Sequence, residues 1–178
     1  LSLVGSEMCI RDSLTFNLIE GMKLSLFGAY TYNIVENSQY LPTSVWANGQ
    51  AYKGTKKRES LLGNMMLTYK KNWKKHFFDV LALAELQKET YTGYYTTVSN
   101  FSTDKFGYNN LQAGALRLWE GTNSYYEQPR LASFMGRFNY TYADRYVLTL
   151  NARTDASSKF GANHKWGFFP SASAAWVI

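Results

Sequence analysis

The sequence predicts an all-β fold of antiparallel strands, each apolar on one face and polar on the other. Hydrophobic residues make up 46% of the 178 residues and aromatic residues 17%, yet the mean hydropathy is −0.33. Apolar side chains are therefore abundant but regularly interrupted by polar ones, which is typical of strands rather than of buried helices. No run of about 18 or more apolar residues occurs, which excludes a transmembrane helix but is compatible with a membrane-spanning β-barrel.

About seven strands are expected, because apolar side chains recur at every second position in seven segments. Within 76–91, for example, Phe78 and Val80 flank the polar Asp79. A helix over 80–89 is the less favoured alternative, although Leu, Ala, Glu, Gln and Lys dominate that segment. In chain order, the expected strands are 14–18, 23–33, 60–70, 76–91, 134–142, 146–154 and a last one that starts near 169 and is still running at Ile178.

The connections between these strands alternate between short and long. Tight turns are expected near Gly21, at 71–75 and at 143–145, and long polar loops at 37–59, 92–130 and 155–167. A structureless loop as long as 92–130 argues against a small compact sandwich. Short turns on one rim and long loops on the other are typical of an outer-membrane barrel. The sequence therefore predicts a partial transmembrane β-barrel with short periplasmic turns and long extracellular loops.

Charged residues remain on the polar faces of the expected strands, where a barrel would meet its water-filled lumen. The candidate lumen-facing residues are Asp79, Glu85, Arg137 and Arg153. They could line a substrate path, or they could simply be solvated side chains and cross-strand pairs. Aromatic residues expected toward strand ends, either as interfacial girdles or because aromatics favour strands, are Tyr30, Tyr32, Tyr69, Trp73, Tyr140, Tyr142, Tyr146 and Trp176.

Composition argues against several classes of function. The net charge is +6, but the basic clusters at 56–58 and 70–75 lie in expected connections or strand ends, so binding to nucleic acid is not predicted. Cys9 is the single cysteine, which excludes a disulfide within the chain and a Cys-based metal site. The two histidines, His76 and His164, belong to no cluster with ligand spacing. No metal or cofactor is predicted, although calcium bound by loop carboxylates is left open.

A catalytic triad is the main enzymatic alternative. Asp155, Ser157 or Ser158 and His164 are close in sequence, but their spacing matches no local signature, and triads are defined by geometry rather than by sequence proximity. Polar loop residues are the favoured interpretation. The sequence therefore predicts no catalytic residues and a protein that is not an enzyme.

The last quarter of the chain carries the most specific pattern. Residues 136–178 read GRFNYTYADRYVLTLNARTDASSKFGANHKWGFFPSASAAWVI, and this segment resembles a signature region of SusC/RagA-like TonB-dependent outer-membrane transporters. Ala156 and Lys159 stand where that family more often has Gly and Arg. The residues that carry the resemblance are Gly136, Arg137, Asn139, Tyr140, Asp144, Arg145, Tyr146, Asp155, Ser157, Ser158, Phe160, Gly161, Trp166, Gly167, Phe169, Pro170, Ser171 and Trp176.

The resemblance covers about residues 14–178 and implies both a fold and a function. It implies part of a plugged barrel of about 22 strands, surrounded by outer-membrane lipid, that imports large nutrients such as glycans or peptides. It also implies two partners, a SusD-like surface lipoprotein that captures substrate and a TonB complex that supplies energy. The alternatives are a non-transporting barrel, such as an adhesin or porin, and a soluble carbohydrate-binding β-sandwich whose apolar faces would meet in a core.

The first 13 residues, LSLVGSEMCIRDS, differ from the rest of the chain. Their apolar run is too short for a signal peptide and is followed by Glu7 and Asp12. Ser6, Glu7 and Met8 also make a poor approach to a lipoprotein cysteine. The stretch resembles a translated sequencing-adapter read-through. We therefore expect residues 1–13 to be a non-native, disordered leader and residues 14–178 to be a partial barrel domain truncated at both ends.

Overall fold

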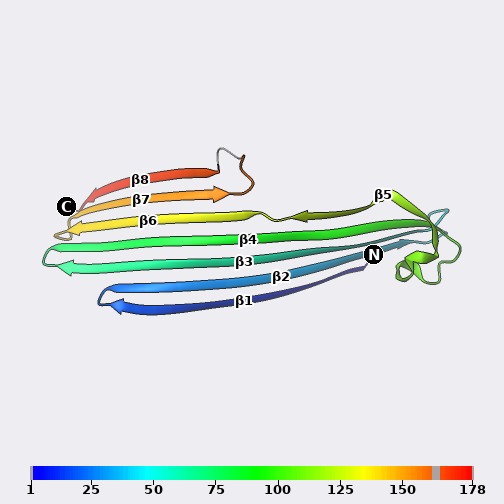
Figure 1. Cartoon of the computed structure of the whole chain (residues 1–178), viewed down its shortest axis with the longest axis horizontal. Helices are drawn as coiled ribbons and strands as arrows, with labels where there is room; N and C mark the ends of the chain where they lie inside the picture. Colours follow the sequence, from blue (N-terminus) through cyan, green and yellow to red (C-terminus); the bar gives the residue numbers. More distant parts are fainter. Residues whose placement is uncertain (1, 162–164, 178) are drawn as a thin grey trace. The chain divides into compact units, whose positions relative to one another are not determined.

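The computed structural model describes residues 2–161 and 165–177, and in that part eight strands form one sheet (Figure 1). The strands are β1 (Ser2–Ile19), β2 (Met22–Leu41), β3 (Gln50–Trp73), β4 (His76–Phe101), β5 (Gly114–Glu127), β6 (Arg130–Tyr142), β7 (Tyr146–Ser157) and β8 (Trp166–Trp176). Two short 3-10 helices, η1 (Gly107–Asn109) and η2 (Leu111–Ala113), follow β4. Neither of these described helices has the length or hydropathy needed to cross a bilayer.

The strands follow one another up and down through the sheet, in the order β1-β2-β3-β4-β6-β7-β8. Strand β5 pairs with residues 91–101 of β4, and β6 pairs antiparallel with residues 76–88 of the same strand. Pro129, which has no backbone N–H, lies in the break between β5 and β6. The all-β, antiparallel class predicted from the sequence is confirmed, and the helix considered for 80–89 is wrong, because those residues belong to β4.

The number of strands and the lengths of the loops differ from the prediction. The described residues form eight strands rather than seven, because the predicted loop 92–130 contains the end of β4 and all of β5. The predicted loop 37–59 shrinks to the turn at 42–49, and the basic cluster at 56–58 lies inside β3. These extensions mix polar and apolar residues without a sustained alternation. They therefore show no period-two pattern over their length, although ladder hydrogen bonds hold them extended.

The predicted tight turns are confirmed, and their backbones explain why they are tight. Gly21 has φ of +81°, and a Cβ atom there would lie 2.1 Å from the carbonyl oxygen of Lys70, so only glycine fits. The β3–β4 turn occurs at Lys74 and Lys75, and the β6–β7 turn at 143–145. Lys74, Ala143 and Asp144 all have positive φ, which is the conformation that two-residue hairpin turns favour.

Residues 2–13 are not disordered in the structure; they form most of β1, in contrast to the prediction. Strand β1 pairs with β2, and nearly all of its side chains are exposed. Two side-chain contacts accompany the pairing: Cys9 Sγ lies 3.5 Å from Thr31 Oγ1, and Thr15 Oγ1 lies 3.2 Å from Ser25 Oγ. A ladder of backbone hydrogen bonds requires no particular side chain, so an unrelated sequence can be held at a sheet edge. The adapter-like origin of this stretch stays a prediction.

The chain divides into two compact units. Unit 1 contains the described residues of 1–9, 31–59 and 89–128, and unit 2 those of 10–30, 60–88 and 129–178. The small buried hydrophobic cluster of Ala51, Val98 and Phe101 belongs to unit 1. Gly114 adjoins it, since a Cβ atom on Gly114 would lie 2.3 Å from Val98 Cγ1. Residues packed around the cluster are Tyr40, Tyr108, Leu111 and Ala113.

Candidate functional site

Unit 2 has one continuous apolar face, which the strand register creates. Val80 of β4 pairs with Phe138 of β6, which pairs with Leu150 of β7, and Leu150 pairs with Ala172 of β8. In the other rows of this face, too, mainly apolar residues pair with one another across the four strands. The apolar face consists of His76, Phe78, Val80, Ala82, Ala84 and Leu86 on β4, Ala132, Phe134, Gly136, Phe138, Tyr140 and Tyr142 on β6, Tyr146, Leu148, Leu150, Ala152, Thr154 and Ala156 on β7, and Trp166, Phe168, Pro170, Ala172, Ala174 and Trp176 on β8.

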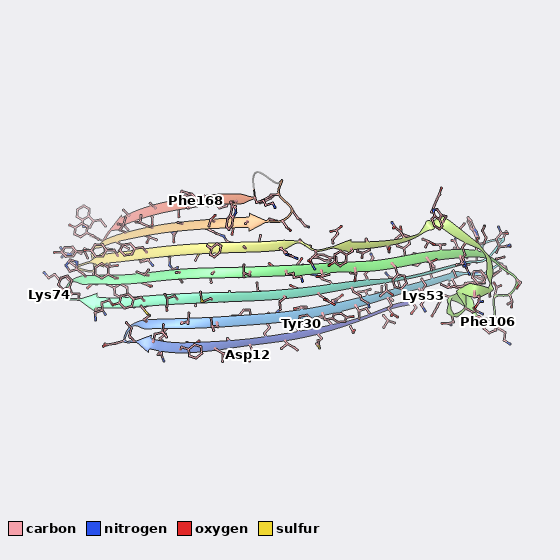
Figure 2. The ribbon with its side chains drawn as sticks, viewed as in Figure 1. Asp12, Tyr30, Lys53, Lys74, Phe106 and Phe168 are labelled. Carbon is pink, nitrogen blue, oxygen red and sulfur yellow. The ribbon has the colours of Figure 1, made fainter. Side chains whose placement is uncertain are left out.

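This apolar face is exposed rather than packed against another layer. Leu150 is 42% exposed and Phe168, labelled on β8 in Figure 2, is 65% exposed. A soluble β-sandwich would bury these side chains between two sheets, whereas a barrel wall leaves them to meet lipid. The described strands all belong to one sheet, which argues against the sandwich alternative.

Aromatic rings gather at one end of the apolar face, beside the short turns. The ring centroids of Tyr142 and Tyr146 are 6.4 Å apart, and those of Tyr146 and Trp176 are 6.3 Å apart. His76 stacks with Trp73 at 5.7 Å, and its Nδ1 lies 2.7 Å from the Tyr140 hydroxyl. Such rows are typical of an interfacial girdle. Tyr30 and Tyr32 do not join a strand end, because β2 extends well beyond both of them.

The opposite face of unit 2 is mostly polar, with interspersed apolar residues such as Leu81 and Leu83, and it carries all four candidate lumen-facing residues. Asp79 pairs with Asn139, Arg137 pairs with Asn151, and these residues alternate with the apolar set along their strands. Glu85 pairs with Ser133, which pairs with Asp155, and Met135 pairs with Arg153. The four charged residues therefore share one face but come from successive rows.

Two ion pairs organise the charges of this polar face. Lys70 Nζ lies 3.6 Å from Asp79 Oδ2, and Arg153 Nε donates to Asp155, with 2.9 Å to Oδ2. Asn151 Nδ2 also donates to Ser171 Oγ, at 3.3 Å. Asp155 falls in a segment predicted to be a loop, so its pairing with Arg153 was not predicted. The two-residue spacing, which places both side chains on one face of a strand, was the sequence signal for this pair.

The signature residues are distributed over unit 2 and do not form one pocket. Gly136, Arg137, Asn139 and Tyr140 belong to β6, and Asp144 and Arg145 to the turn that follows it. Tyr146, Asp155 and Ser157 lie on β7, and Ser158, Phe160 and Gly161 follow that strand. Trp166, Gly167, Phe169, Pro170, Ser171 and Trp176 form much of β8. His164, the third member of the triad considered above, lies outside the described residues.

In unit 1, a hydrogen-bonded cluster ties the turn after β2 to the segment after β4. Asp104 Oδ1 accepts from the Tyr40 hydroxyl at 2.6 Å and from the Thr43 backbone N–H at 3.1 Å. Its Oδ2 accepts from the Thr43 hydroxyl at 2.7 Å. These bonds lower the pKa of Asp104, first through Tyr40. Burial and then the bond to Asp104 raise the pKa of Tyr40 to about 12.

The order of this cluster should depend on pH at both extremes. Because the pKa of Asp104 is depressed below 3.8, its contribution to stability is present above that value and is lost as pH falls through the folded-state pKa. The pKa of Tyr40 is raised from 10.0, so its contribution is present below pH 10.0 and is lost as pH rises toward about 12. We expect the NMR signal of the Thr43 methyl group to report both transitions. Asp104→Asn should abolish the acid transition, and an unchanged acid transition in that variant would contradict the assignment.

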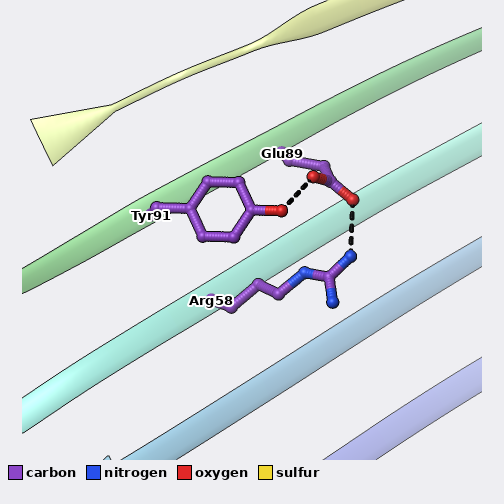
Figure 3. A network of polar contacts seen from close by, with 3 residues as sticks. All are labelled: Arg58, Glu89 and Tyr91. Atoms are coloured by element: carbon purple, nitrogen blue, oxygen red, sulfur yellow. Dashed lines mark hydrogen bonds and ion pairs between the residues drawn. The ribbon is translucent and has the colours of Figure 1, made fainter.

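A second polar network in unit 1 joins β3 to β4 (Figure 3). Glu89 accepts from Arg58 Nη2 at 2.7 Å and from the Tyr91 hydroxyl. The Arg58 guanidinium also lies 5.6 Å from the centre of the Tyr91 ring. The hydrogen bond to Glu89 is the first cause of a raised pKa of Tyr91. The network therefore keeps Tyr91 in its neutral, hydrogen-bonding form.

Several exposed aromatic side chains lie on β4 and β5 of unit 1. Trp119 is 90% exposed and Tyr126 is 65% exposed. Tyr125 pairs with Gly93, and a Cβ atom on Gly93 would lie 2.7 Å from its ring, so the missing side chain makes room for that ring. These residues were not predicted as candidates, because they fall in the segment 92–130, which was expected to be a loop.

Groups of three or more potential metal-ligating side chains are absent from the described residues. Three of the carboxylates already accept hydrogen bonds from hydroxyl or guanidinium groups: Asp104, Glu89 and Asp155.

Comparison with known proteins identifies consistent relatives, although no protein-family profile matches the chain. TonB-dependent receptor P3 of Formosa agariphila is 30% identical over 165 residues, which cover 90% of this chain and 16% of that receptor. TonB-dependent receptor SusC of Bacteroides thetaiotaomicron is 28% identical over 185 residues, covering 92% of this chain and 16% of SusC. The chain therefore spans about a sixth of the length of these relatives.

The fold also matches solved structures of a peptide transporter. The structure of the RagAB peptide transporter superimposes with a TM-score of 0.83 over 97% of this chain and 20% of that chain, at 18% sequence identity. The 'closed-closed' state of the RagAB peptide importer gives a TM-score of 0.79 at the same identity. At this identity the match supports the fold.

Proposed function

The chain belongs to the SusC/RagA-like TonB-dependent receptors, as part of their β-barrel, and from this premise we propose that the whole protein is an active transporter that imports large nutrients across the outer membrane. The observation that carries the proposal is the two-faced sheet of unit 2. Its apolar face is continuous over four strands and exposed, and its opposite face carries the charged residues and most of the polar ones. A face of this kind on a soluble protein would be covered by another layer.

In this proposal, the apolar face of unit 2 contacts lipid and the polar face contacts the lumen. The girdle at Tyr142, Tyr146 and Trp176 marks the periplasmic interface, beside the short turns. Further strands of the receptor pair with the outer edges of the sheet, because an open edge in lipid would leave backbone groups without partners. Asp79, Glu85, Arg137 and Arg153 then face the lumen, where they contact the plug or the passing substrate.

In this proposal, unit 1 meets the arriving substrate. Its exposed Trp119, Tyr126 and Tyr94 offer flat aromatic surfaces with hydrogen-bonding edges, which suit both sugar rings and peptide groups. We assign the substrate to oligosaccharides or peptides, in keeping with the resemblance to SusC and RagAB. Capture by a SusD-like lipoprotein and energy from a TonB complex complete the proposed cycle.

Uptake measurements in cells test this function. We expect cells that carry the receptor to accumulate a fluorescent oligosaccharide or peptide from a defined library, and deletion of the receptor gene to abolish that accumulation. Loss of TonB should abolish it equally, because active import needs the energy supply. Uptake that continues without TonB would identify a passive porin instead.

Variants of unit 1 refine the same experiment. Trp119→Ala combined with Tyr126→Ala should reduce uptake and co-purification with the surface lipoprotein, because both large exposed contact areas are lost. The matched control is Leu116→Ala, an exposed position on the same strand. Equal losses in the control and in the double variant would contradict a specific aromatic surface.

A further inference from the structure

We propose that the apolar face of unit 2 carries a binding site for a phosphorylated membrane lipid, at the end of the face farthest from the short turns. This inference rests on the proposed membrane setting of unit 2. The site is an open depression of about 830 Å³ that lies entirely within that unit. It combines an apolar floor with a cationic margin, and each part follows from the strand register.

The floor of the depression arises from small residues between large ones. Leu86 pairs with Ala132, Ala132 with Ala156, and Ala156 with Trp166, so two alanines separate a leucine from a tryptophan in one row. Neighbouring strands lie about 4.8 Å apart, which makes the hollow between Leu86 and Trp166 wide enough for acyl chains. Gly28 and Gly63 extend the lining of small residues beyond β4.

The cationic margin lies one row farther along the strands. Lys88 pairs with Arg130, two residues beyond Leu86 and Ala132, which is a displacement of about 7 Å along the strands. Lys165 belongs to the same lining, and its carbonyl accepts from the Ser157 N–H at 3.2 Å. Ser158 completes this margin, since its hydroxyl accepts from the Arg130 N–H at 2.9 Å.

Charge identifies the headgroup. Three cations line the depression, and its described lining contains no carboxylate. Lysine and arginine bind phosphate oxygens through charge-assisted hydrogen bonds, and seryl hydroxyls donate to the same oxygens. A zwitterionic headgroup would bring its own positive charge close to these three cationic side chains, which would repel it. The site therefore favours a lipid whose headgroup ends in phosphate.

The expected depths of the cationic margin and the apolar floor in the membrane match those of a lipid headgroup and its acyl chains. Trp166 stacks on Phe134 with centroids 6.1 Å apart, and tryptophan prefers the level of the lipid headgroups. The cations lie just beyond that level, whereas the leucine and alanine floor lies at or below it. A lipid phosphate and its chains would meet the two parts of the site in this order.

The test measures binding of short-chain lipids to the full-length receptor in an uncharged detergent. Dioctanoyl phosphatidic acid should bind more tightly than dioctanoyl phosphatidylcholine, and inorganic phosphate should compete only weakly because it lacks chains. Lys88→Gln combined with Lys165→Gln should weaken phosphatidic acid binding about 30-fold, at the usual gain per cation near a headgroup. Lys159→Gln, an exposed lysine outside the depression, is the matched control and should leave the affinity unchanged.

A second variant tests the apolar floor with the cations intact. Ala132→Leu fills the hollow and should weaken phosphatidic acid binding, and it should leave the weak competition by inorganic phosphate unchanged. Equal affinity for the two lipids, an effect of Lys159→Gln as large as that of the double variant, or no effect of Ala132→Leu would each overturn the inference. Nutrient uptake is measured separately on the wild type. Failure of uptake with retained headgroup preference would reject the proposed transport alone, and the reverse result would reject the lipid site alone.

Discussion

Leu150→Arg is expected to destabilise the folded receptor in a bilayer by about 2–4 kcal/mol, the usual cost of arginine at mid-depth on the lipid face of a barrel. Leu150 lies near the middle of the apolar face of unit 2, between its partners Phe138 and Ala172. A guanidinium there would have no polar neighbour on its own face and would face hydrocarbon. The measurement is reversible unfolding of the receptor in lipid vesicles by guanidinium chloride, followed by the mobility shift between folded and unfolded forms.

The matched control for this prediction is the next residue. Asn151→Arg places the same side chain on the polar face, where Asn151 pairs with Arg137 and Ser171. We expect a much smaller cost there, set by the nearby Arg137 charge rather than by lipid. Equal destabilisation by the two variants would show that the faces are not divided between lipid and water, and it would remove the principal support for a barrel wall.

Phe101→Ala should open unit 1 without affecting insertion of the receptor into the membrane. Phe101 is 6% exposed, and its ring meets that of Tyr40 edge to face at 5.4 Å. Truncation of a buried phenylalanine to alanine costs about 3–5 kcal/mol, because apolar burial is lost and a cavity is left. Hydrogen exchange should show this loss at two amides, Asn100 N–H bonded to Gly49 and Phe101 N–H bonded to Asn48.

Phe106→Ala provides the control for that experiment. Phe106 lies in the connection just after β4, close in sequence to Phe101, but is 48% exposed, so its removal should change the local opening free energy by no more than about 0.5 kcal/mol. Similar exchange in both variants would mean that the cluster of Ala51, Val98 and Phe101 does not hold unit 1 together. Loss of the mobility shift in Phe101→Ala would mean that the two units do not fold independently.

The sequence predicted unit 2 far better than unit 1, for a physical reason. In unit 2, Phe138, Tyr140 and Leu150 alternate with Arg137, Asn139 and Asn151, because one side of the sheet is apolar and the other polar. That alternation marks the strands and their two faces, and the short interruptions between strands mark the tight turns. In unit 1, residues such as Thr96 and Thr122 pair through their hydroxyls at 3.0 Å, and neither face is consistently apolar. The sequence of β5 therefore shows no period-two alternation from which a strand could be predicted.

In the candidate site, too, some features were predictable from the sequence and others were not. Asp79, Glu85, Arg137 and Arg153 were predicted from alternation alone, and the register places all four on one face. The partner of Asp79 could not be predicted, since Lys70 reaches it from another strand. The bonds of Asp104 to Tyr40 and Thr43 join residues about 60 positions apart in sequence, and no local pattern encodes such a pairing.

By itself, the sequence determined the all-β class, the two faces of unit 2, the short turns and the resemblance carried by residues 136–178, because each depends on neighbours within a few positions. Tertiary structure alone decided the eighth strand, the extended state of residues 2–13, the cluster around Asp104 and the depression between Leu86 and Trp166. Each of these depends on register, which brings distant residues together by backbone pairing rather than by side-chain pattern.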